Sequence, residues 1–184
     1  MPRDRKRILI VDGFNVLRSS SRYKNLAAPT PDFDSDVLNR ARETLINDVV
    51  LFAGKEYQAT IVFDGGGNEF STGASETVGG VRIVFSPAGS SADKVIEKLA
   101  FEARQRNIET MVVTSDATIQ DTVFGLGVDR MSAEGFAIEM NRYHEETHQD
   151  AVPATAEKRT VAGRIDAATL AKLIALRDGT DVQS

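Results

Sequence analysis

Three stretches of this sequence follow one pattern, an apolar run that ends in an acidic residue. "ILIV" leads into Asp12, "ATIVF" into Asp64, and "MVVTS" into Asp116. Short runs rich in β-branched residues are typical of strands buried on both faces, as in a parallel sheet. Segments with helical spacing separate the runs, and this alternation predicts an α/β fold with right-handed crossovers and helices on both faces of the sheet.

The expected elements follow this alternation. Strands are expected at 8–11, 59–63 and 81–86, within 109–116, and as a short edge strand at 128–131; helices are expected at about 37–52, 91–107, 117–127 and 132–148. Residues 19–36 are polar and contain two prolines, so they are expected to form a loop. Residues 68–80 are expected to form a surface loop or a loose hairpin.

Length and composition indicate one globular domain with a short appendage. The chain has 184 residues, of which 41% are apolar, and its composition changes near Gln149. We therefore expect one domain at 1–148, followed by a linker and a C-terminal helix at 149–184. The sequence has no cysteine, which excludes disulfides, thiolate zinc sites and a cysteine nucleophile. Neither a membrane span nor a signal peptide is expected, and this favours the cytoplasm.

Several acids should meet at one edge of the sheet. The carboxyl ends of parallel strands share an edge, where ligands of open α/β sheets bind, so Asp12, Asp64 and Asp116 should approach one crevice. Asp93 opens the helix after the third strand, and Glu97 lies on the same face of that helix. Each acid alone also fits a turn or the start of a helix, and Glu97 and Asp121 also fit a solvated helix face.

Crowded carboxylates repel one another unless a cation neutralises them. Mg²⁺ and Mn²⁺ take oxygen ligands, and such ions activate water for attack on phosphodiesters. Asn15 follows the first acid by three residues, and its amide could orient a carboxylate or bind a phosphate. The sequence therefore predicts a Mg²⁺ or Mn²⁺ site at the carboxyl edge of the sheet.

The motifs "LIVDGFNVL", "IVFDGGG", "VRIVFSPAGSSADKVIEKLA" and "VVTSDATIQDTV" resemble those of the YacP-like branch of the NYN domains, within the PIN-like nuclease superfamily, over about residues 7–146. The resemblance implies a PIN-like three-layer α/β/α sandwich with a mainly parallel central sheet. It also implies a metal-dependent endoribonuclease that uses metal-activated water, with at least one branch acting on ribosome-associated mRNA. The implied catalytic residues are Asp12, Asp64, Asp93 and Asp116, the metal ligands Asp12, Asp93 and Asp116, and the supporting residues Asn15, Ser91, Glu97, Ser115 and Asp121.

The expected partner is RNA, single-stranded by preference, and possible ribosome association follows from the resemblance. The net charge of −5 counts against nucleic acid, but a local basic patch could still bind phosphates. The predicted RNA-binding residues are Arg18, Arg22 and Lys24, and the candidates for base stacking are Phe14, Tyr23 and Phe70. The N-terminal cations Arg3, Arg5, Lys6 and Arg7 fit either such a patch or a solvated terminus.

Three other functions compete with this one. The first is a non-catalytic RNA- or ribosome-binding module on the same fold. The second is a zinc hydrolase, because His144, Glu145 and His148 fit the H-E-x-x-H pattern, although the surrounding residues are polar and no third histidine exists. The third is a haloacid-dehalogenase type of phosphatase, which needs a second aspartate where Phe14 stands.

Overall fold

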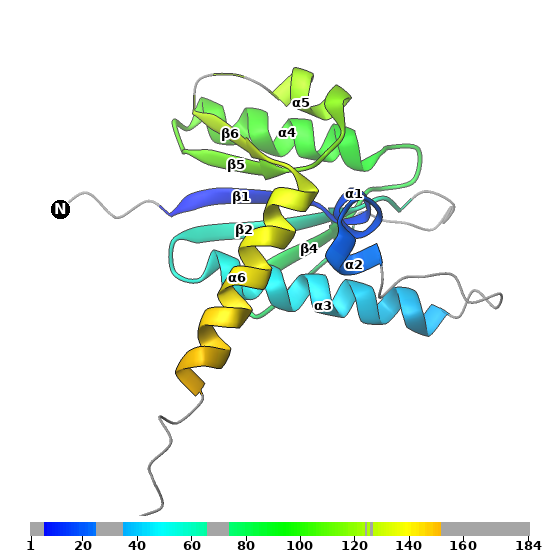
Figure 1. Cartoon of the computed structure of the whole chain (residues 1–184). Coiled ribbons are helices and arrows are strands. Elements are labelled where there is room, and N and C mark those ends of the chain that lie inside the picture. Colours follow the sequence, from blue (N-terminus) through cyan, green and yellow to red (C-terminus); the bar gives the residue numbers. More distant parts are fainter. Residues whose placement is uncertain (1–5, 25–34, 66–73, 124, 126, 152–184) are drawn as a thin grey trace, which may run out of the picture. The chain divides into compact units, whose positions relative to one another are not determined.

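The computed structural model describes residues 6–24, 35–65, 74–123, 125 and 127–151 (Figure 1). The chain divides into two compact units, Met1–Tyr143 and His144–Ser184. The expected boundary at 148/149 stays a prediction. Phe70, Arg3, Arg5 and the expected C-terminal helix lie outside the described residues.

A six-stranded sheet forms the centre of the first unit, in the order β3-β4-β2-β1-β5-β6. The strands are β1 (Arg7–Asp12), β2 (Tyr57–Phe63), β3 (Ser75–Val78), β4 (Val81–Phe85), β5 (Thr110–Val113) and β6 (Val128–Met131). Only the pairing of β3 with β4 is antiparallel within the described residues; the other neighbours are parallel. The predicted, mainly parallel sheet is thus confirmed.

Helices cover both faces of the sheet, as Figure 1 shows. They are α1 (Gly13–Ser19), α2 (Ser21–Lys24), α3 (Ser35–Ala53), α4 (Ala92–Gln105), α5 (Ala117–Val123) and α6 (Ala133–Ala151). One core packs β1, β2 and β4 against α1, α3 and the first turns of α6, through side chains such as Phe63 and Phe136. The opposite core packs the sheet against α4 and α5, through side chains such as Ile96 and Ile119. This is the expected three-layer α/β/α arrangement.

The expectation of a loop at 19–36 is wrong where this segment is described, because it contains the end of α1 and all of α2. Local capping explains the difference. The Asp12 side chain accepts a hydrogen bond from the backbone N–H of Asn15 and caps α1. The Ser21 amide and hydroxyl at the start of α2 donate to the Glu134 carboxylate at 2.9 and 2.7 Å.

The loose hairpin expected before the third predicted strand is confirmed in its described part, where β3 pairs with β4. All four β3 residues are exposed.

The turn between β1 and α1 requires a glycine. A Cβ atom on Gly13 would lie well inside van der Waals distance of the Phe63 ring. The missing side chain lets the backbone pass close to this ring and bend directly from strand into helix. Asp12 is thereby held at the carboxyl edge of the sheet, between β1 and α1.

Candidate active site

Asp12 is the central acid of the candidate site. It is the last residue of β1 and is only 6% exposed. One carboxylate oxygen accepts a hydrogen bond from the backbone N–H of Asn15 at 3.4 Å. The other accepts one from the Thr114 hydroxyl at 3.0 Å. These donors fix the orientation of a carboxylate that is nearly removed from solvent.

Thr114 joins two of the predicted acids, and sequence reasoning missed it. Its buried hydroxyl donates to Asp12 and accepts a hydrogen bond from the Asp116 amide at 3.1 Å. The Asp116 carboxylate in turn accepts a hydrogen bond from the Thr118 amide at 2.8 Å at the start of α5. The signal was present in "TSD", because a hydroxyl residue directly after a buried strand lies at the same edge as the acids.

Asn15 and Ser115 tie the end of β5 to α1 and α6. The Asn15 side-chain oxygen accepts a hydrogen bond from the Ser115 amide at 2.7 Å, and the Ser115 hydroxyl accepts one from the Ala133 amide at 3.0 Å. Both predicted supporting residues therefore hold the backbone that carries Thr114 and Asp116.

Asp64 and Asp93 extend the acidic edge. Asp64 follows β2 and accepts a hydrogen bond from the Ser86 hydroxyl at 3.0 Å; Ser86 is buried at the end of β4, and sequence reasoning missed it too. Asp93 lies in the first turn of α4, close enough to Asp116, Glu97 and Asp64 for their charges to act on it. The structure thus brings Asp12, Asp64, Asp93, Glu97 and Asp116 into one electrostatic group.

Burial and like charge act on two of these acids. Burial raises the pKa of Asp12 to about 6, with a further increase from Asp93 and Asp116, although the hydrogen bonds from Thr114 and Asn15 oppose it. Burial also raises the pKa of Asp93, followed by repulsion from Asp116, Glu97 and Asp64. Burial is the main cause of both shifts, and the like charges of the neighbouring acids add to it.

The donor set fits a hard divalent cation, but only in part. Carboxylate oxygens are the ligands that Mg²⁺ and Mn²⁺ prefer. Within the described residues, however, no three acidic or histidine side chains converge closely enough to hold one ion together. Mg²⁺ commonly binds through one or two carboxylates and keeps several waters, and this mode suits the arrangement.

Two predicted supporting residues lie apart from this group. Ser91 caps α4 by accepting a hydrogen bond from the Lys94 amide at 3.4 Å, so it positions the helix that carries Asp93. Asp121 is exposed on α5, and no interaction joins it to the other acids among the described residues.

The three predicted RNA-binding residues differ in their surroundings. Arg18 and Lys24 are exposed, whereas Arg22 binds the buried Asp48 carboxylate through two nitrogens at 2.7 and 3.2 Å. A third nitrogen of Arg22 donates to Asn141 at 2.6 Å. The guanidinium of Arg22 is therefore engaged within the fold, and Arg18 and Lys24 remain the cations of this set that face solvent.

Two of the proposed stacking residues take part in packing. Tyr23 is fully buried, and its hydroxyl donates to Asp48 at 2.6 Å, so the expectation that it stacks on a base is wrong. Phe14 is half-buried, and its ring meets the Phe63 ring edge-on at 5.2 Å between centres.

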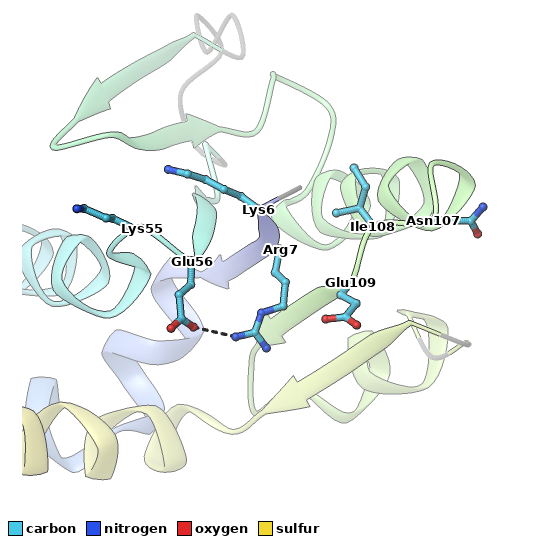
Figure 2. A pocket seen from close by; sticks show the side chains of 7 residues that line it. All are labelled: Lys6, Arg7, Lys55, Glu56, Asn107, Ile108 and Glu109. Atoms are coloured by element: carbon cyan, nitrogen blue, oxygen red, sulfur yellow. Dashed lines mark hydrogen bonds and ion pairs between the residues drawn. The ribbon is translucent and has the colours of Figure 1, made fainter. Parts of the chain in front are cut away.

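A hollow of about 680 Å³ lies at the other edge of the sheet, where β1, β2 and β5 begin. It is lined by Lys6, Arg7, Lys55, Glu56, Asn107, Ile108 and Glu109. Figure 2 shows the ion pair between Arg7 and Glu56, whose atoms are 2.9 Å apart. Three cations and two acids line this hollow, and none of the predicted catalytic residues does.

The H-E-x-x-H motif lies on α6, in the second unit. The side chain of His148 lies outside the described residues, and the zinc hypothesis stays a prediction. No helix in the described part of the chain is long and apolar enough to cross a membrane.

Comparison with known proteins adds independent evidence. The sequence model of the YacP-like NYN domain family matches residues 9–178. This match extends further toward the C-terminus than the resemblance seen over residues 7–146. The chain is 28% identical to the uncharacterized protein YacP of Bacillus subtilis, over 86% of this chain and 88% of that protein.

Two crystal structures of Rae1 (YacP) from Bacillus subtilis are similar in fold, each at 25% identity. One covers 94% of this chain and 95% of the other with a TM-score of 0.61; the second, of a point mutant of the same protein, covers 92% and 99% with a TM-score of 0.60. The sheet, the helical layers and the matched sequence agree, and the chain belongs to the YacP-like NYN domain family, a branch of the PIN-like nuclease superfamily.

Proposed function

We propose that the protein is a metal-dependent endoribonuclease that cleaves RNA phosphodiesters at the carboxyl edge of its sheet. The observation that carries this proposal is the buried Asp12 carboxylate, on which the charges of Asp93 and Asp116 act. A buried carboxylate with like-charged neighbours costs folding free energy, so it points to a function, and accumulated acids suit a divalent cation. Membership of a nuclease superfamily agrees with this chemistry.

Among Asp12, Asp93 and Asp116, one or two carboxylates would bind Mg²⁺ or Mn²⁺ directly and the others through its waters, with Asp64 as a further catalytic acid. When bound, the cation activates water and offsets charge on the phosphodiester during in-line displacement. Thr114 and Asn15 orient Asp12 through their hydrogen bonds, and Ser86 orients Asp64. Asn15 and Ser115 keep the β5 end, and hence Asp116, in place.

Single-stranded RNA is the proposed substrate. Flexible single strands can bring a phosphate to the acidic edge, and sequence-specific recognition of RNA mostly uses unpaired bases. Arg18, on α1, and Lys24, on α2, are exposed and would bind backbone phosphates. Messenger RNA engaged on ribosomes is the physiological form to test beside the naked strand.

The test is a cleavage assay with purified protein and an internally labelled single-stranded RNA. We expect internal cleavage with Mn²⁺ or Mg²⁺ and none in EDTA. Asp12→Asn and Asp93→Asn should each reduce the rate roughly 100-fold or more, while circular dichroism shows the same fold. The matched control is Asp129→Asn, which removes an exposed acid on β6 and should cleave at the normal rate.

Cleavage that persists in EDTA and in both variants would refute the metal mechanism. RNA binding without any cleavage, with either metal and on naked or ribosome-bound mRNA, would instead favour the non-catalytic binding module.

A further inference from the structure

A guanidinium group lies against aromatic rings near the acidic edge. The central guanidinium carbon of Arg42, on α3, is 4.9 Å from the centre of the Phe63 ring and 5.1 Å from that of Phe85. These two rings stack with their centres 5.6 Å apart, and Phe14 meets Phe63 edge-on. We call Phe14, Phe63 and Phe85 the aromatic cluster. Arg42 is half-buried on it.

The aromatic cluster adjoins the candidate site at both ends. Phe63 and Phe85 are the last residues of β2 and β4 and face each other in register. The residues that follow them, Asp64 and Ser86, are hydrogen-bonded to each other at the carboxyl edge. Phe14 lies two residues after Asp12, at the start of α1. Arg42 therefore packs on the ring that directly precedes one predicted catalytic acid.

The hydrogen-bonding capacity of Arg42 is largely unused. A guanidinium has five N–H donors, and the hydrogen bond of Arg42 among the described residues is a long one, 3.5 Å to the Asn39 side chain. Its Nε is buried with no partner there. Glu43 and Glu76 line the same open groove of about 480 Å³, yet no ion pair joins Arg42 to either of them in the described part of the chain.

Arg22 shows how a partly buried arginine of this protein is otherwise paired. Arg22 is also partly buried, but its donors are taken by Asp48 and Asn141. Burying part of an arginine costs free energy, which ion pairs normally offset. Aromatic contact offsets part of this cost at Arg42 and fixes the plane of the guanidinium. The remaining donors then suit a bidentate contact with a phosphate.

We propose that Arg42 is a substrate-positioning residue that binds a backbone phosphate of the RNA, next to the nucleotide at the acidic edge. This inference rests on the proposed function and adds a specific phosphate contact to it. Arg18 lies at the other end of the aromatic cluster, with its guanidinium carbon 5.6 Å from the Phe14 ring centre. A strand that crosses the cluster would thus meet a guanidinium on each side.

The experiment measures RNA binding without cleavage. Fluorescence anisotropy with a 5′-labelled single-stranded RNA is recorded across a salt series, with every variant in the Asp12→Asn background. Arg42→Gln should raise Kd about five- to tenfold. It should also reduce the slope of log K against log salt by about 0.7, the share of one phosphate contact on a single strand. Arg40→Gln is the matched control, because Arg40 is exposed two residues away on α3.

A purely structural role predicts a different result. Arg42→Gln would then lower the thermal unfolding temperature but leave the salt slope equal to that of Arg40→Gln, and this outcome would overturn the proposal. Arg42→Lys covers the case in which the glutamine variant does not fold. It keeps the charge, so it should retain the salt slope while Kd rises because the planar fork is lost; an unchanged Kd would also overturn the proposal.

This result can be separated from the test of catalysis. If the parent chain cleaves RNA but Arg42→Gln binds like Arg40→Gln, only the phosphate contact is refuted. If Arg42→Gln weakens binding as expected but the parent chain never cleaves, the contact stands and the endoribonuclease proposal fails.

Discussion

At the scale of single residues, Asp12 is held between opposing forces. Burial and the charges of Asp93 and Asp116 favour its protonated form, while hydrogen bonds from Thr114 and Asn15 favour its carboxylate. The net result, a pKa of about 6, lies above the ordinary value of 3.8. An acid with this pKa is mostly ionised at physiological pH, so it can bind a cation there, whereas protonation competes with the cation below about pH 6.

This pKa predicts that Asp12→Asn stabilises the metal-free protein. The folded state binds the proton more tightly than the unfolded state, so the contribution of Asp12 to stability falls as pH rises from about 4 to about 6 and is constant above. The shift corresponds to at most about 3 kcal/mol, and the loss of the carboxylate oxygen that accepts from the Thr114 hydroxyl offsets roughly 1 kcal/mol, whereas the asparagine oxygen can still cap α1. We expect a gain of about 1–2 kcal/mol at neutral or higher pH, measured by urea unfolding in EDTA.

The gain should shrink at acidic pH, where Asp12 is protonated in the folded state. Asp129→Asn, at an exposed position, should change stability by less than about 0.5 kcal/mol at either pH. Equal destabilisation by Asp12→Asn at both pH values would contradict the cause given for the shift.

The acids and Asn15 could be predicted from the sequence, but Thr114 and Ser86, whose hydroxyls orient Asp12 and Asp64, were missed. Asp12, Asp64 and Asp116 each end an apolar run, so a parallel topology brings them to one edge. Thr114 and Ser86 are small polar residues after strands, a position that also suits ordinary turns. Their roles depend on hydrogen bonds between segments 102 and 22 residues apart, which a local pattern does not encode.

At the scale of elements, predictability follows the clarity of the apolar pattern. The helix expected at 37–52 is α3, because apolar residues recur along it with helical spacing, and the strand expected at 59–63 lies within β2, because a continuous apolar run marks it. The seven-residue α1 and four-residue α2 are too short to show a helical period, and their stability comes from caps and packing. β3 shows no alternation, because both of its faces are exposed.

The short helix α2 is joined to α3 by a buried charge. Asp48 is 2% exposed and binds both Arg22 and Tyr23. Burial and then the Asp48 carboxylate raise the pKa of the Tyr23 hydroxyl, which therefore remains protonated and donates. Arg22 supplies the positive charge that makes burial of Asp48 tolerable.

Arg22→Gln should therefore destabilise the protein by about 2–3 kcal/mol, because it removes the guanidinium that pairs with the buried Asp48 carboxylate. The measurement is the free energy of unfolding in urea. Arg18→Gln is the matched variant on the neighbouring helix α1. Because the Arg18 side chain is exposed, we expect this variant to change the free energy of unfolding by less than about 0.5 kcal/mol. Its RNA binding should depend less steeply on salt than that of the parent chain. A stable Arg22→Gln protein with a smaller salt slope for RNA binding would support the predicted RNA-binding role of Arg22.

At the scale of the whole molecule, charge is the main obstacle to RNA binding. The chain carries a net charge of −5, and five acids act on one another at the edge where RNA is proposed to bind. Without a cation, this edge should repel phosphates. The opposite edge carries Lys6, Arg7 and Lys55, but Glu56 and Glu109 lie among them.

Removing one acid at the edge should therefore strengthen RNA binding in EDTA, although it would impair cleavage. At low salt, we expect Asp116→Asn to lower Kd about two- to threefold, the effect of one charge roughly 6–10 Å from a phosphate at the dielectric constant of water. Asp129→Asn removes the same net charge from an exposed site on β6 and should leave Kd nearly unchanged. The difference between the variants should disappear at about 1 M salt, where charges are screened within roughly 3 Å. If both variants bind alike at low salt, total charge rather than the acidic edge governs RNA affinity, and the strand does not approach Asp116.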